Sequence, residues 1–170
     1  MKWCLLAAFA ATALVGCGGG GPLGGQSRAV LSLGHTVDSL SEAIQGGRSL
    51  HLRVPGHDYA TINKDTSGWT GAFDGARSSG TSILKDEVGG LADDDAKTVI
   101  EASCRALDLL DRAQAPTVDT AVYDVARQLP DGLYSHVLAL GRRLEEARNS
   151  SDTTGALAKI FICDGTAALG

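Results

Sequence analysis

Residues 28–45 read RAVLSLGHTVDSLSEAIQ and are followed by Gly46-Gly47, and this stretch decides the class of fold. Its apolar residues recur three and four positions apart, which places them along one face of an α-helix; they are Val30, Leu33, Val37, Leu40 and Ile44. A glycine pair directly after such a stripe is typical of a helix C-terminus. The spacing therefore predicts an amphipathic helix whose apolar face other helices must cover.

The same spacing returns after residue 93. A second long helix is expected to begin at Asp93-Asp94-Asp95, because carboxylates can cap free amides and favour the positive end of the helix dipole. Pro116 ends this pattern, since proline cannot continue a helix. Thr117 is then expected to cap a shorter helix that stops at Pro130.

Two further apolar stripes, at 133–144 and 156–161, complete the pattern. Short connections between amphipathic helices are typical of helical bundles. The sequence therefore predicts an all-α fold, a small bundle of about four to five helices. We expect it to form a single domain over residues 28–170.

Residues 46–80 interrupt the helical period with seven glycines. We expect a long glycine-rich loop insertion here, between the first two long helices. Within it Leu50, Leu52 and Val54 alternate with His51 and Arg53, which predicts a short strand or extended arm.

This loop carries three aromatic side chains, Tyr59, Trp69 and Phe73, which a disordered linker would lack. We therefore expect the loop to be ordered against the bundle. The three rings are candidates for an interaction surface, and they could equally plug the end of a core otherwise made of Leu, Val and Ala.

The composition excludes some classes of protein. The 170 residues are 44% hydrophobic and 21% charged, which is ordinary for a globular domain. The net charge of −5 argues against a nucleic-acid partner, because nonspecific binding to phosphates needs a basic face.

Residues 1–16 do not belong to the fold. Lys2 supplies positive charge before an apolar run, Trp3–Val15, that is shorter than the ~20 residues of a membrane-spanning helix. A charged start followed by a short apolar run is typical of an export signal.

The sequence Leu14-Val15-Gly16-Cys17 resembles the lipobox of bacterial lipoprotein precursors. The resemblance implies that residues 1–16 are a signal peptide and that Cys17 becomes linked to diacylglycerol through its sulfur. Residues 17–27 are then the lipidated cysteine and a flexible, glycine-rich tether. Because Gly18 replaces the aspartate that favours inner-membrane retention, the resemblance implies the outer membrane if the source is Gram-negative.

Two cysteines remain in the expected domain, Cys104 and Cys163. In an exported protein such a pair favours a disulfide, and the alternative is two buried free thiols. The spacing has no C-x-x-C arrangement, so we expect no redox catalysis.

Residues 63–74 resemble part of an EF-hand calcium loop, with oxygen-bearing side chains at Asn63, Asp65, Ser67 and Asp74 and a glycine at Gly68. The first position lacks the usual aspartate, and Asp74 is shorter than the usual bidentate glutamate. Since Asn, Asp, Ser and Gly also form ordinary turns, these four residues are weak candidates and we expect no metal.

We find no catalytic motif and expect neither enzymatic activity nor a cofactor. Two functions remain. The first is a non-catalytic envelope lipoprotein, held at the membrane by its lipid, whose helical domain binds a protein partner or assists assembly. Pilotins, small helical lipoproteins with an internal disulfide that deliver secretin subunits, are similar in architecture but share no motif. The alternative is a ligand- or calcium-binding domain that uses His57, Asp65 and Asp74 of the 46–80 loop.

Overall fold

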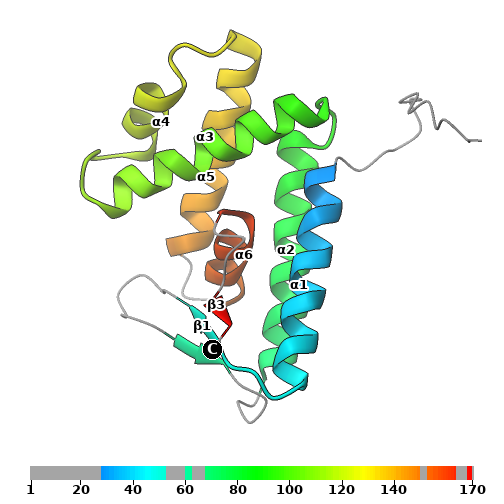
Figure 1. The fold of residues 1–170 in the computed structure, drawn as a ribbon. Helices are drawn as coiled ribbons and strands as arrows, with labels where there is room; N and C mark the ends of the chain where they lie inside the picture. The colour runs from blue at the N-terminus through cyan, green and yellow to red at the C-terminus, as the bar shows by residue number, and fades with distance from the viewer. Residues whose placement is uncertain (1–27, 53–59, 63–67, 150–152, 164–167, 170) are drawn as a thin grey trace, which may run out of the picture.

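The computed structural model describes residues 28–52, 60–62, 68–149, 153–163 and 168–169 (Figure 1). Most of these residues are helical, which confirms the all-α class. The helices are α1 (Arg28–Gln45), α2 (Trp69–Val88), α3 (Asp93–Asp111), α4 (Val118–Ala126), α5 (Asp131–Asn149) and α6 (Thr153–Cys163). The strands are β1 (Leu50–Leu52), β2 (Ala60–Ile62) and β3 (Ala168–Leu169).

Helix α1 has the bounds that its apolar stripe predicts, and Leu33, Val37, Leu40 and Ile44 are all buried. Its end is a Schellman motif. The Gly47 amide donates to the Ile44 carbonyl (2.9 Å) and the Arg48 amide donates to the Ala43 carbonyl (3.0 Å). Gly47 has φ +94°, a left-handed conformation that glycine adopts without steric cost.

The starts of α3 and α4 differ in how they are capped. Thr117 caps α4 as expected, because its hydroxyl accepts a hydrogen bond from the Thr120 amide (3.2 Å). The capping expected from Asp93-Asp94-Asp95 is wrong. The N-cap residue of α3 is Ala92, and no side chain bonds there. The three carboxylates occupy the first turn instead, where they still face the positive end of the helix dipole.

The prediction of a loop throughout residues 46–80 is wrong, because α2 begins at Trp69. This helix also raises the count in the described residues to six, above the expected four to five. The helical spacing of apolar residues in α2 is hard to recognise in the sequence, because glycines occupy positions where neighbouring helices approach this helix. A Cβ at Gly80 would lie 2.8 Å from Leu33 Cδ2 of α1, and one at Gly75 would lie 2.8 Å from Thr154 Cγ2 of α6.

Helix α2 lies between α1 and α6, while α5 packs against α3, α4 and α6 (Figure 1). Leucine, isoleucine, valine and alanine from the six helices, together with Phe73 and Phe161, form one continuous core. Ser103 is its buried polar residue. The Ser103 hydroxyl lies 2.8 Å from the Val99 carbonyl of α3 and 3.2 Å from the Val137 carbonyl of α5, so its single O–H donor has acceptors inside the core.

The predicted extended arm is present as β1, the central strand of a three-stranded antiparallel sheet with the order β2-β1-β3. Leu50 is fully buried, and it pairs with Ile62 of β2 and Leu169 of β3. Val54 lies outside the described residues. The sheet thus joins the segment after α1 to the C-terminal end of the chain.

Candidate functional site

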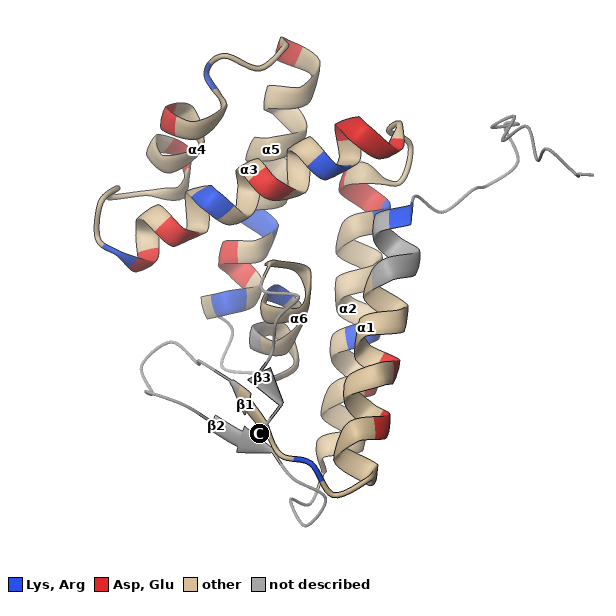
Figure 2. Ribbon diagram, in the orientation of Figure 1, with Lys and Arg blue, Asp and Glu red and all other residues tan. Residues whose placement is uncertain are grey.

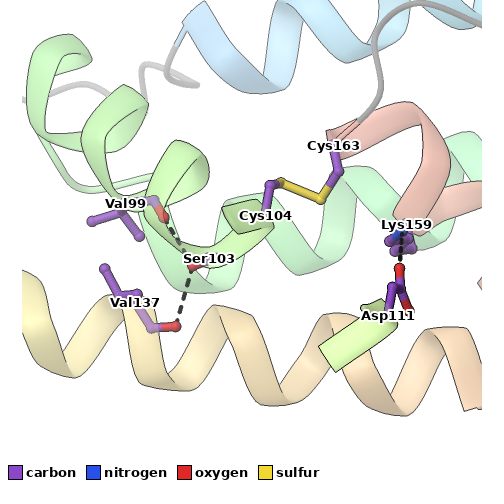
Figure 3. The surroundings of a disulfide bond; sticks show 7 residues. All are labelled: Val99, Ser103, Cys104, Asp111, Val137, Lys159 and Cys163. Carbon is purple, nitrogen blue, oxygen red and sulfur yellow. Dashed lines mark hydrogen bonds and ion pairs between the residues drawn. A yellow bond between two sulfur atoms is a disulfide. The ribbon is translucent and has the colours of Figure 1, made fainter. Parts of the chain in front are cut away.

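The disulfide is the predicted feature that the structure places most clearly. Cys104 of α3 and Cys163, the last residue of α6, are bonded, with their Cα atoms 5.3 Å apart (Figure 3). That separation lies within the usual range for disulfides. The bond closes the long segment between the two helices, so its effect is to fix α6 against α3.

Next to the disulfide lies an ion-pair cluster that the sequence did not predict. Lys159 Nζ of α6 lies 3.5 Å from Asp111 Oδ2, at the last residue of α3 (Figure 3). Arg148 of α5 also pairs with Asp111, and lies 4.0 Å from Glu145. The side chains of Lys159 and Arg148 are each only 13% exposed. Nothing in the spacing of these residues along the chain signals the cluster, because three separate helices supply it.

The three aromatic candidates have different outcomes. Phe73 is buried at 1% exposure, stacks on Phe161 with ring centroids 5.4 Å apart, and meets Trp69 edge to face at 5.6 Å. Phe73 is therefore part of the core and cannot contact a partner, which favours the plug over the interaction surface. Trp69 is half-buried at the start of α2, and Tyr59 lies outside the described residues.

The described structure contains one of the four weak calcium candidates. Asn63, Asp65 and Ser67 lie outside it, and Asp74 is exposed on α2. Gly68 has φ +84°, as the sharp turn in such a loop requires, but it is also the N-cap residue of α2. Within the described residues no three His, Cys, Asp or Glu side chains are grouped closely enough to hold a metal ion.

The described histidines lie on three separate elements. His35 of α1 and His51 of β1 are exposed, His136 of α5 is half-buried, and His57 lies outside the described residues. An open hollow lies along α2, but one helix supplies all of its described lining. Asp74, Arg77, Ser78, Thr81, Ser82, Lys85 and Asp86 form that lining. Without a facing element among the described residues, this surface does not enclose a substrate.

Arg142 and Asp119 form an ion pair between α5 and α4. Arg142 of α5 donates two hydrogen bonds to the Asp119 carboxylate of α4, from Nε at 2.8 Å and from Nη2 at 2.6 Å. These hydrogen bonds lower the pKa of Asp119 below its ordinary value and raise that of Arg142. The pair is exposed and bridges α4 and α5, so we assign it to joining the two helices.

Comparison of the chain with protein-family models, with curated proteins and with solved structures finds no match. Within the described part of the chain, no helix combines the length and the apolar character needed to cross a bilayer.

Proposed function

We propose that this protein is a bacterial envelope lipoprotein, anchored through lipid on Cys17, whose helical domain serves as a non-catalytic protein-interaction or assembly module. The observation that carries the proposal is the sequence Leu14-Val15-Gly16-Cys17 at the end of a short apolar run that follows a charged start. The residues between Cys17 and the start of α1 at Arg28 are rich in glycine, as a tether would be.

Two features of the described domain support an exported, non-catalytic protein. A disulfide between Cys104 and Cys163 suits an oxidising compartment, since such bonds are rare in the cytosol of most organisms. The second feature concerns the side chains that could act in catalysis. Ser103 is committed to backbone carbonyls, and the described histidines lie on three separate elements.

Metabolic labelling with an alkyne analogue of palmitate tests the anchor. We expect the full-length protein, expressed in a lipoprotein-processing bacterium, to take up label and to sediment with membranes. Cys17→Ala should lose both the label and the membrane association. Cys4→Ala is the matched control, because it removes the cysteine inside the expected signal peptide, and it should be labelled like the wild type. Equal labelling of the Cys17→Ala protein would overturn the proposal.

Crosslinking in membranes tests the interaction role. Tyr123 on α4 is the exposed large hydrophobic side chain of the described residues, at 57% exposure, so a photoreactive phenylalanine analogue fits this position without disturbing the core. We expect a discrete crosslinked product with another envelope protein. If no protein is trapped and calcium raises the melting temperature, the ligand-binding alternative is favoured instead.

A further inference from the structure

Helix α6 is the last helix of the described residues, and the disulfide sits at its far end. Cys163 is the last residue of α6, whereas Cys104 lies in the interior of α3. The near end of α6, Thr153, follows shortly after α5 ends at Asn149. Helix α6 is therefore held at both ends, by the chain before Thr153 and by the covalent bond at Cys163.

Noncovalent packing holds the body of α6, and most of it is on α2. Phe161 stacks on Phe73 with ring centroids 5.4 Å apart. A Cβ at Gly80 of α2 would lie 3.6 Å from Ile162 Cδ1 and 3.8 Å from Ala158 Cβ. The contact between α6 and α3 is less extensive than that between α6 and α2. A helix near the end of a chain can lose such packing as one unit, without unfolding of the remaining helices.

Two further ties on α6 are weak. Lys159 is the one charged residue of α6, whereas charged residues follow one another along α3 (Figure 2). Its partner at 3.5 Å, Asp111, is 40% exposed, and solvent screens an ion pair of that kind. After α6, strand β3 pairs with β1 through only two residue pairs, which are too few to hold a helix in place.

The covalent bond restrains α6 in a way that these ties do not. Phe161 lies two residues before Cys163, so it cannot move far from Phe73 while Cys163 is bonded to Cys104. Once that bond is broken, the far end of α6 is held only by packing and the weak ties. The helix can then leave α2 as a unit.

We propose that Cys104–Cys163 is a redox-controlled lock on α6. The oxidised domain releases α6 only when the whole domain unfolds, whereas the reduced domain releases α6 alone and uncovers the face of α2 around Phe73 and Gly80. This device does not depend on acylation of Cys17, so it stands or falls separately from the proposed lipid anchor.

The chemistry of release is thiol–disulfide exchange with a dithiol. Cys104 and Cys163 are half-buried, so the bond lies at the edge of the core, unlike the fully buried Ser103. One thiolate of the dithiol attacks one cysteine sulfur and displaces the other cysteine as a thiolate. The second thiolate of the dithiol then closes the reductant's own disulfide and frees the first cysteine. Two electrons pass from the dithiol to the protein, and the released thiolates take up protons from water.

Hydrogen exchange read by mass spectrometry tests the lock. The sample is the full chain in mild detergent, carrying Cys4→Ala/Cys17→Ala so that Cys104 and Cys163 are its two remaining cysteines. Exchange is followed in the oxidised protein and after reduction with dithiothreitol. Amides of α5 report opening of the whole domain. Helix α1 is the internal control, because it is the first helix of the described residues and has no cysteine.

In the oxidised protein we expect residues 157–161 of α6 to exchange as slowly as α5. In the reduced protein they should exchange at least about tenfold faster than α5, whereas the ratio of α1 to α5 should not change. Cys104→Ser/Cys163→Ser should show the reduced pattern with or without dithiothreitol. Exchange of α6 together with α5 after reduction, or an equal excess of α6 exchange in both redox states, would overturn the lock.

A substitution at Lys159 tests the same device from the weak tie. Lys159→Met should raise the exchange of α6 relative to α5 in the reduced protein and change it little in the oxidised protein, where the disulfide still holds the helix. Arg142→Met is the matched control, because it removes an ion pair between α4 and α5 and should leave the exchange of α6 relative to α5 unchanged in both states. An equal effect of Lys159→Met in both redox states would show that the disulfide does not lock α6.

Discussion

Ala113 adopts a conformation that usually belongs to glycine. It has φ +53°, the one positive φ among the described non-glycine residues, and it follows α3 in a Schellman motif. The Ala113 amide donates to the Leu110 carbonyl (3.0 Å) and the Gln114 amide donates to the Leu109 carbonyl (2.8 Å). Gly47 holds the corresponding place after α1. A left-handed conformation costs an L-residue about 1–2 kcal/mol, so α3 ends with strain that α1 avoids.

Ala113→Gly is therefore expected to raise the free energy of unfolding. The relieved strain exceeds the extra entropy of glycine in the unfolded chain, about 0.5–1 kcal/mol, which leaves a net gain of about 0.5–1 kcal/mol. Urea denaturation measures the change. The control is Ala139→Gly, inside α5, where the same replacement should lower stability by about 1 kcal/mol. A loss of stability at both positions would contradict this account.

Gly80 and Gly71 lie in the same helix but in different surroundings. A Cβ at Gly80 would meet buried Leu33 at 2.8 Å, whereas a Cβ at Gly71 would meet nothing within 4 Å. We expect Gly80→Ala to lower the free energy of unfolding by about 1 kcal/mol, because the overpacking penalty exceeds the gain in helix propensity. Gly71→Ala should raise it by about 0.5–1 kcal/mol. Thermal or urea denaturation that ranks Gly80→Ala as the more stable variant would contradict the close packing of α1 on α2.

At the scale of elements, the sequence predicts helices with one strong apolar stripe and misses α2. The bounds of α1 follow from its stripe and its terminal glycines, and Pro116 separates α3 from α4. Helix α2 contains Gly71, Gly75 and Gly80, which lower helix propensity in isolation. Tertiary packing stabilises α2 despite this low propensity, because Gly75 and Gly80 let α6 and α1 approach closely. A single sequence does not reveal that benefit.

The disulfide joins two elements that are far apart in the chain. Cys104 and Cys163 are 59 positions apart, so the chain-entropy relation gives a stabilisation of about 4 kcal/mol through the unfolded state. We expect reduction to lower the free energy of unfolding by that order, measured by urea denaturation with and without a phosphine reductant. Cys104→Ser/Cys163→Ser should be destabilised similarly and should not respond to the reductant. Equal stability of the oxidised and reduced wild type would contradict the prediction.

At the scale of the whole molecule, the sequence predicts the all-α class but not how its helices are joined. The apolar stripes require a shared core, whereas partners distant in the chain leave no local pattern. Lys159 and Asp111 meet only because α6 folds back beside α3 (Figure 3). The pairing of β3 with β1 likewise joins the segment after α1 to the last described residues of the chain. Phe73 illustrates the same limit, since its spacing does not distinguish a core ring from an exposed one.

Carboxylates join helices across this molecule, so acid should weaken it. Asp119 pairs with Arg142, and this contact holds the folded-state pKa of Asp119 below its ordinary value of 3.8. The unfolded state therefore binds this proton more readily, and the contribution of Asp119 to stability is complete above the unfolded pKa. It is lost as the pH falls through the lowered folded pKa.

Asp119→Asn is expected to be less stable than the wild type at neutral pH, by a margin that is constant down to about pH 5 and then shrinks as the wild-type carboxylate is protonated. Urea denaturation at a series of pH values measures the margin. Asp124→Asn is the matched control, because Asp124 is exposed on the same helix, and we expect it to show no comparable margin. Added salt should also reduce the Asp119 margin, since the pair is exposed to solvent. A margin that stays constant through pH 3, or that grows in acid, would show that the Arg142 contact does not stabilise the charged form of Asp119.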